Sequence, residues 1–175
     1  MMEIKQQTYF GKITNINESE KFIECNILHF DTANENRWMP VTGCLDAFLT
    51  RMEKAKKNVV ACYQHDESIV IGTWKDLTIT GNVLSGKLFY VETQFVKDTV
   101  LPLLKAGALQ GASPSIAPIR DSWNDDTRTW EILEGVLCEV SLVGLPADLK
   151  ADILTIQAKI QSQNKDDFDL DLLTL

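Results

Sequence analysis

Three polar side chains lie far apart in this sequence, and together their types could activate a hydroxyl group for nucleophilic attack. They are His65, Ser113 and Glu139. An imidazole takes up a proton near neutral pH, a hydroxyl becomes a nucleophile as it loses its proton, and a carboxylate can orient the imidazole. If folding gathers the three, the chemistry that they predict is acyl transfer through a serine nucleophile.

His65 follows a short β-rich run, residues 58–63, and comes just before Asp66 and the Ile71-Gly72 pair. A histidine at the end of a strand sits on a rigid support and can still face a cleft. A lone histidine is more often a surface or capping residue, so the interpretation as a general base depends on the other two segments.

Ser113 lies among small residues, with Gly111 and Ala112 before it and Pro114 after it. Small neighbours let a substrate backbone approach and can leave amide N–H groups free for an oxyanion. Pro114 supplies no such amide, so other residues must donate to the oxyanion. The alternative is a kinked edge strand, because neither Pro114 nor Pro118 can donate to a β-ladder.

Glu139 lies in a long apolar run that favours a strand. Alternation places Glu139, Ser141 and Val143 on one face, and Cys138, Val140 and Leu142 on the other. A carboxylate within an apolar strand is costly without a partner, and a histidine N–H would be one. The alternative is an edge strand with Glu139 in water.

The surrounding pattern predicts a mostly β, α+β domain with about three helices. Two polar loops are expected, at residues 31–40 and 121–128, and a hairpin turn at Gly81-Asn82. Strands are expected at residues 9–16, 22–30, 58–63, 69–74, 77–79, 83–91, 109–119 and 130–145. Helices are expected at residues 42–52 with Thr42 as the N-cap, from Thr93 to a stop at Gly107, and at residues 149–160.

The composition excludes several classes of function. The chain has 175 residues, enough for one domain, and its formal charge of −8 disfavours nucleic acid as a partner. No apolar run is long enough for a membrane helix, and synthesis in the cytosol is the default. Only two histidines and four widely spaced cysteines occur, so no metal site or cofactor is expected. We expect residues 161–175, which are acidic, to form a mobile tail.

Together the segments around His65, Ser113 and Glu139 resemble the prohead proteases of tailed bacteriophages, a capsid-maturation family distantly similar to the herpesvirus assemblins. The likeness spans roughly residues 25–155 and is most specific at residues 104–113 and 139–147. It implies a herpesvirus-protease-like, mostly antiparallel β-barrel within a protease domain of residues 1–160.

The resemblance also implies roles for single residues. His65 matches the family's histidine, and Ser113 matches the nucleophile when the segment is aligned without a gap. The family's segment usually continues Ser-Ile-Gly-Phe, which Ser115-Ile116-Ala117 imitates two residues later, so Ser115 is the second choice. Glu139 falls where assemblins carry a second histidine, and a carboxylate third member is expected there.

The function implied is that of a serine endopeptidase acting in the host cytoplasm, inside the assembling prohead. Its expected substrates are the major capsid protein and the scaffold protein, with its own tail as a further candidate. Nucleic acid and membrane are not expected as partners, and a homo-oligomer is possible.

Two rival hypotheses stay open. One is a non-catalytic assembly protein, a protease-like fold that binds scaffold or capsid protein, which the Pro114 departure favours. The other is a cysteine hydrolase that uses Cys62 or Cys138, although neither spacing brings thiol and imidazole together in an obvious way.

Overall fold

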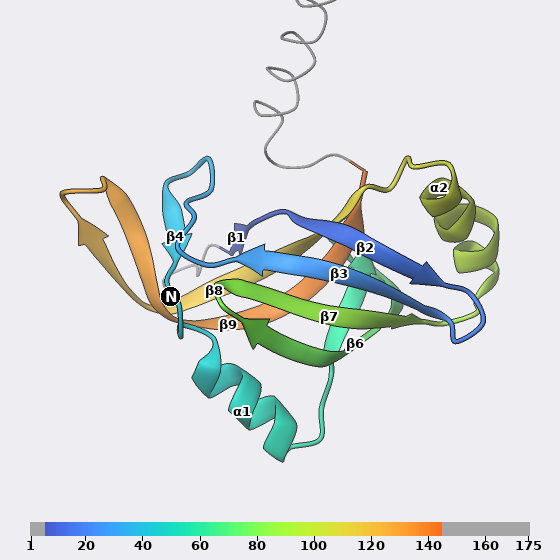
Figure 1. The fold of residues 1–175 in the computed structure, drawn as a ribbon, viewed down its shortest axis with the longest axis horizontal. Coiled ribbons are helices and arrows are strands. Elements are labelled where there is room, and N and C mark those ends of the chain that lie inside the picture. Colours follow the sequence, from blue (N-terminus) through green and yellow to red (C-terminus); the bar gives the residue numbers. More distant parts are fainter. Residues whose placement is uncertain (1–5, 145–175) are drawn as a thin grey trace, which may run out of the picture.

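The computed structural model describes residues 6–144, which form a closed β-barrel with helices at its periphery (Figure 1). The sheet has nine strands in the order β1-β8-β2-β3-β7-β6-β5-β9-β4, and an additional β8–β9 pairing closes seven of them into a ring. The strands are β1 (Gln7–Thr8), β2 (Gly11–Asn17), β3 (Phe22–His29), β4 (Trp38–Pro40), β5 (Val59–Tyr63), β6 (Asp66–Thr80), β7 (Val83–Tyr90), β8 (Gly111–Asn124) and β9 (Thr129–Val143). The helical segments are α1 (Asp46–Lys54), η1 (Val96–Val100) and α2 (Leu101–Lys105).

The barrel interior is filled by the alternate residues of its strands. In β7 the buried positions alternate strictly with half-buried ones, as expected for a strand with one face on a core. Trp74 of β6 is completely buried, and its Nε1 donates a hydrogen bond to the Val140 carbonyl at 3.0 Å. This bond satisfies the indole N–H and ties β6 to β9, the strand that carries Glu139.

The closure of the barrel requires β2 to lie very close to both of its neighbours, β8 and β3. A Cβ on Gly111 would lie 2.1 Å from the Gly11 carbonyl oxygen, and one on Gly11 would lie 2.0 Å from the Asn26 carbonyl oxygen. Only glycine fits at such distances from a neighbouring backbone. The two glycines therefore let the N-terminal part of the chain lie directly against the start of β8, two residues before Ser113.

Two of the three expected helices lie in the described part of the chain. The helix after Thr93 forms as predicted: the Thr93 hydroxyl accepts a hydrogen bond from the Val96 N–H at 3.2 Å, and Gly107, at a φ of +70°, ends the segment. The first helix begins at Asp46, and the prediction that Thr42 caps it is wrong. The hydroxyl and the N–H of Thr42 both donate to the Asp31 carboxylate instead, at 2.7 and 2.9 Å.

Three details of the predicted strands and loops are also wrong. Residues 38–40, expected to belong to a loop, form β4 and pair with β9. The expected loop at residues 121–128 begins four residues later, because β8 continues to Asn124 and pairs with β9 up to Thr129. Cys138 does not share the regular alternation of β9. Ser115 faces Glu139 whereas Ile116 faces Leu137, so Cys138 is the extra residue of a β-bulge.

The remaining predicted elements lie outside the described residues. These are the helix at residues 149–160 and the acidic tail at residues 161–175, so the count of three helices stays a prediction. No helix in the described range is long and apolar enough to cross a membrane.

Candidate active site

His65 is carried by a two-residue hairpin turn between β5 and β6. Tyr63 pairs with Asp66, and the two residues between them, Gln64 and His65, have φ values of +54° and +60°. Positive φ at both central positions is the type I′ pattern, which normally uses Asn or Gly. The turn is held by β9, because the N–H of Gln64 donates to the Leu142 carbonyl and the N–H of His65 donates to Ser141 Oγ, each at 3.0 Å.

The parallel pairing of β5 with β9 places this turn next to Glu139. Cys62 of β5 lies beside Ser141 of β9, so the chain leaving β5 passes next to the polar face of β9. His65 Nδ1 lies 2.7 Å from Glu139 Oε1. Ser141 Oγ donates to the other carboxylate oxygen, Oε2, at 2.7 Å. Each oxygen of this buried carboxylate therefore has a partner, which offsets the cost of its burial.

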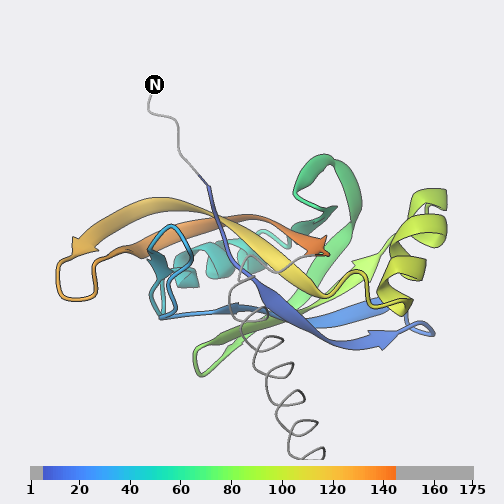
Figure 2. The same cartoon turned by 90° about the horizontal axis from the view of Figure 1, so that it is seen from above.

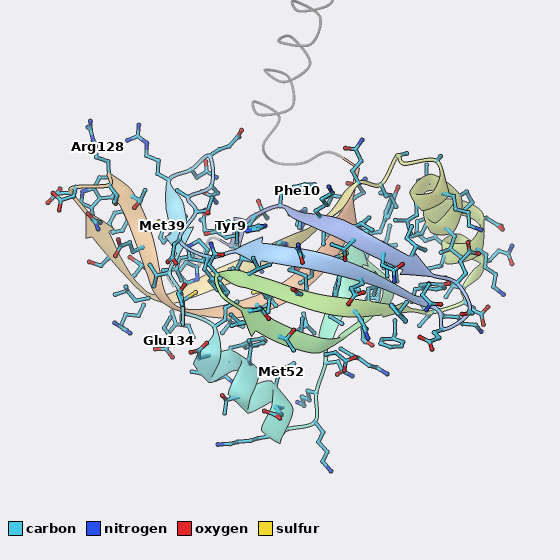
Figure 3. The ribbon with its side chains drawn as sticks, viewed as in Figure 1. Tyr9, Phe10, Met39, Met52, Arg128 and Glu134 are labelled. Carbon is cyan, nitrogen blue, oxygen red and sulfur yellow. The ribbon has the colours of Figure 1, made fainter. Side chains whose placement is uncertain are left out.

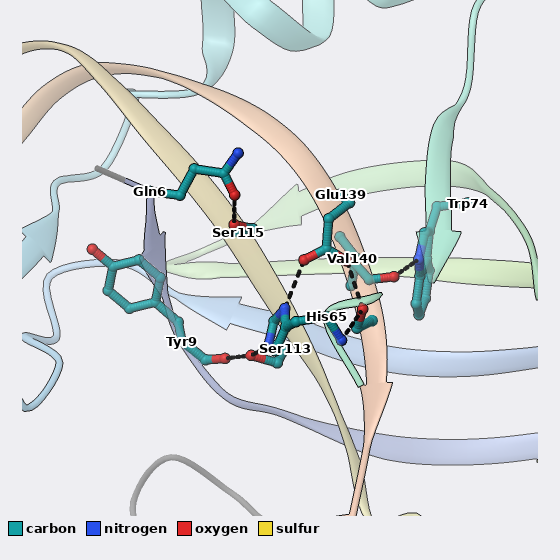
Figure 4. A network of polar contacts seen from close by, with 9 residues as sticks. Gln6, Tyr9, His65, Trp74, Ser113, Ser115, Glu139 and Val140 are labelled. Atoms are coloured by element: carbon teal, nitrogen blue, oxygen red, sulfur yellow. Dashed lines mark hydrogen bonds and ion pairs between the residues drawn. The ribbon is translucent and has the colours of Figure 1, made fainter. Parts of the chain in front are cut away.

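Ser113 lies on the other side of the imidazole. Its Oγ is 2.8 Å from His65 Nε2, within hydrogen-bonding distance (Figure 4). The antiparallel β8–β9 ladder sets this position, because Ser113 faces Ser141 directly and Glu139 diagonally. The three residues predicted from the sequence are therefore brought together from two strands and one turn, in the order hydroxyl, imidazole, carboxylate.

Ser115 points to a different partner. Its Oγ donates to Gln6 Oε1 at 2.5 Å, and no contact with His65 is recorded among the described residues. The geometry therefore favours Ser113 over Ser115 as the nucleophile.

Ser113 also touches the N-terminal part of the chain. Its hydroxyl donates to the Tyr9 carbonyl oxygen at 2.5 Å (Figure 4). Tyr9 is itself buried, and burial raises the pKa of its phenol well above the usual range. Figure 3 shows Tyr9 and Phe10 together where this segment passes β8. A groove of about 720 Å³ begins there, lined by residues 8–10, 28–29 and 32–36.

The thiols are poorly placed for chemistry. Burial raises the pKa of Cys62 to about 11, with a further contribution from the Glu139 charge. Burial also raises the pKa of Cys138. A thiol that keeps its proton is a weak nucleophile, so burial disfavours both cysteines in that role. Within residues 6–144 no three histidine, cysteine or acidic side chains gather closely enough to hold a metal ion.

Two participants were missed at the level of sequence. The placement of Ser141 on the same face as Glu139 follows from strand alternation, but nothing in the sequence shows that it joins the carboxylate to the backbone of His65. The Tyr9 carbonyl is a main-chain group, and its only signal is indirect: Pro114 has no N–H to give a neighbouring strand.

A hydroxyl, an imidazole and a carboxylate connected in this order, on a closed β-barrel, are the arrangement of serine hydrolases. The family model for the caudovirus prohead serine proteases matches residues 12–166, and the chain belongs to that family. It is thus a protease of virus head maturation.

A solved structure gives the same fold. The capsid assembly protease gp21 of bacteriophage T4 superimposes with a TM-score of 0.64 at 15% sequence identity, covering 79% of this chain and 97% of the T4 protein. No curated protein sequence matches the chain at a significant level. The predicted likeness to the herpesvirus proteases is not tested by these comparisons and stays a prediction.

Proposed function

We propose that this protein is a serine endopeptidase in which Ser113 is the nucleophile and His65 is the general base. Glu139 orients the imidazole and stabilises its protonated form. The observation that supports the proposal is the pair of short contacts on the two ring nitrogens: 2.8 Å from Nε2 to Ser113 Oγ and 2.7 Å from Nδ1 to Glu139 Oε1.

The reaction proceeds by acyl transfer. His65 Nε2 takes the Ser113 proton as Oγ forms a bond to the scissile carbonyl carbon, and the tetrahedral adduct then expels the amine, which receives that proton. Water, activated by the same nitrogen, hydrolyses the resulting ester and restores the serine. Glu139 stabilises the imidazolium that exists between these proton transfers.

The proposed substrates are the scaffold protein and the major capsid protein, and the proposed place of action is the interior of the assembling prohead in the host cytoplasm. Membership of the prohead protease family supports both. Cleavage of the chain's own tail, residues 161–175, belongs to the same proposal.

The test is co-expression of the protein with the capsid and scaffold proteins of its own virus, with mass spectrometry of the products. Ser113→Ala should abolish processing, by a factor on the order of 10⁵ or more in rate, because it removes the hydroxyl that contacts the general base. Ser115→Ala is the matched control, since it removes a hydroxyl two residues along the same strand, and it should not reduce processing. Processing that persists in both variants contradicts the serine mechanism; processing lost only in Ser115→Ala transfers the nucleophile to that residue.

A second candidate function is non-catalytic binding of capsid or scaffold protein. The observation that favours it is the Ser113 hydroxyl, whose proton is directed to the Tyr9 carbonyl rather than to His65. The same experiment separates the two, because a pure binding protein yields unprocessed but assembled particles even with the native sequence.

A cysteine mechanism is separated by alkylation. Because burial raises its pKa to about 11, the Cys62 thiol stays largely protonated at pH 8. Iodoacetamide at that pH should therefore leave processing unchanged. Loss of activity in step with modification of Cys62 or Cys138 would revive the cysteine hydrolase.

A further inference from the structure

The two N-terminal strands, β1 and β2, both pair with β8. They share one register and are separated by a single interruption near Ser113. Gly11 faces Ala112, Thr8 faces Ser115, and Gln7 faces Ile116. The same register carried through the interruption places Tyr9 opposite Pro114. β1 and β2 therefore follow β8 as one antiparallel strand would, with an interruption at residues 9 and 10 (Figure 2).

Pro114 explains the interruption. In an antiparallel pair whose residues face each other across hydrogen bonds, each residue donates its N–H to the carbonyl of the other. The N–H of Tyr9 does donate to the Pro114 carbonyl, at 3.2 Å. The reciprocal bond cannot form, because proline has no N–H. The Tyr9 carbonyl consequently lacks its ladder donor at a position where the Tyr9 side chain is buried.

The Ser113 hydroxyl donates to the Tyr9 carbonyl in place of the missing N–H. A carbonyl can only accept, so in the contact at 2.5 Å the serine must donate its one proton to Tyr9. The only hydrogen bond left for His65 Nε2 and Ser113 Oγ to share, at 2.8 Å, is one in which Nε2 is the donor. In that arrangement the imidazole already holds a proton on the nitrogen that should receive one.

We propose that Pro114 is a positioning residue that restrains the nucleophile: by leaving the Tyr9 carbonyl without a ladder donor, it directs the Ser113 proton to the N-terminal strand and away from His65. Ser113 becomes a full nucleophile when the strand shifts and this bond breaks. The inference rests on the proposed function, since it concerns how the serine of that site is activated.

The anchors of the strand are mostly polar and lie on its N-terminal side. Asn34 Nδ2 donates to the Thr8 carbonyl at 3.2 Å, and Gln6 Oε1 accepts from Ser115. Beyond Tyr9 the chain is fixed by the close packing of Gly11 and Gly111. The segment that can loosen without opening the barrel is therefore the short stretch before Phe10, which contains the carbonyl that holds the serine proton.

The test measures the reactivity of Ser113 with a fluorescent fluorophosphonate in the full-length protein. In this reaction Oγ forms a bond to phosphorus, fluoride leaves, and the serine proton passes to His65. Pro114→Ala gives residue 114 an N–H that competes with Ser113 Oγ for the Tyr9 carbonyl, so the serine proton is held less firmly there and turns more readily to Nε2. The labelling rate constant should rise about fivefold, the worth of one net hydrogen bond.

The matched control is Pro118→Ala. It removes a proline from the same strand, at a position paired with Gly135 on the β9 side, and should leave the rate unchanged. If Pro114 only stabilised the fold, its replacement would lower the labelling rate of Ser113. A higher rate in Pro114→Ala therefore shows that Pro114 acts on the position of the serine proton. In Pro114→Ala the amide of residue 114 should also be protected from hydrogen exchange, because it enters the ladder.

Gln6→Ala is the second variant, in case Pro114→Ala does not fold. Gln6 is exposed, and its loss removes an anchor of the strand, so labelling should rise about twofold to threefold, less than a full hydrogen bond's effect.

The outcomes separate the two proposals. If the native protein is labelled at Ser113, Ser113→Ala is not, and neither Pro114→Ala nor Gln6→Ala reacts faster, the restraint is wrong while the serine mechanism stands. An amide at residue 114 that exchanges freely also overturns the restraint. If no variant is labelled at Ser113, the nucleophile itself is wrong and the restraint falls with it.

Discussion

β8 and β9 carry two serine–glutamate pairs of the same kind, and only the glutamate of one pair belongs to the candidate active site. Ser115 faces Glu139 where the two strands close the barrel, and Ser122 faces Glu131 where they project beyond it as a hairpin beside β4 (Figure 1). Glu139 is 2% exposed, whereas Glu131 is half-buried and Ser122 is exposed. The two pairs have the same residue types facing each other across the same two strands, but they differ in burial.

The difference lies in a third segment. The β5–β6 turn packs against Glu139 of the near pair and gives it a histidine partner, while Ser141 donates to the second carboxylate oxygen. In the far pair, Glu131 accepts a hydrogen bond from Asn124, its neighbour across the hairpin. Cross-strand register supplies carboxylates and hydroxyls at fixed spacing, but a site arises only where a non-local segment brings an imidazole to them.

Between the two serine–glutamate pairs, the largest expected difference comes from neutralising the buried carboxylate. Glu139→Gln keeps the shape of the side chain but removes the charge that stabilises imidazolium and fixes its tautomer. The rate of scaffold cleavage in a single-turnover assay should fall about 10⁴-fold, the effect of the corresponding Asp→Asn change in a Ser-His-Asp triad.

Glu131→Gln is the paired control at the far position, and its cleavage rate should stay within about twofold of the native rate, because surface substitutions away from a site have small effects. Equal losses in the two variants would mean that the near pair is not distinguished by its contact with His65.

Strand alternation was enough to predict the near face of β9. Glu139 and Ser141 fall on one side because the period of a strand is two, and the small residues before Ser113 mark a place where a backbone lies close. The alternation fails at Cys138 because a bulge inserts one residue there, and a bulge leaves no trace in the hydrophobic pattern.

The position of His65 could not be predicted from local sequence. Gln64 and His65 both take positive φ, which costs non-glycine residues roughly 1–2 kcal/mol each and is not encoded by their side chains. Bonds from β9, 76 positions away for the Ser141 contact, impose that conformation. The extension of β8 to Asn124 was missed for a similar reason: residues 121–124 are polar, and their pairing with β9 makes them a strand.

A smaller effect is expected from Ser141, which joins the carboxylate to the backbone of the His65 turn. Ser141→Ala leaves one buried carboxylate oxygen and the His65 N–H without their partner, so the free energy of unfolding should fall by about 1–3 kcal/mol. The looser imidazole should lower the cleavage rate by about tenfold, the cost of roughly one hydrogen bond in the transition state.

Ser122→Ala is the matching change in the far half, at an exposed position, and should alter neither stability in urea nor the cleavage rate. If Ser141→Ala is destabilised but cleaves at the native rate, Ser141 supports the fold only and does not position the imidazole.

The smallest effect on catalysis is expected at the tip of the hairpin. Trp123 packs edge-on against Trp130, with ring centroids 5.4 Å apart, and Trp130 stacks on Trp38 of β4 at 5.7 Å. Trp123→Ala removes one aromatic contact, so the free energy of unfolding measured in urea should fall by about 1 kcal/mol. Trp123→Phe should recover most of that loss, because a phenyl ring preserves the edge-on contact. Cleavage should stay at the native rate in both variants, since the aromatic cluster and the candidate site lie in different halves of the β8–β9 hairpin. A tenfold loss of cleavage in Trp123→Ala, with a folded barrel, would show that the far half acts on the site, and the division between the two halves would then be wrong.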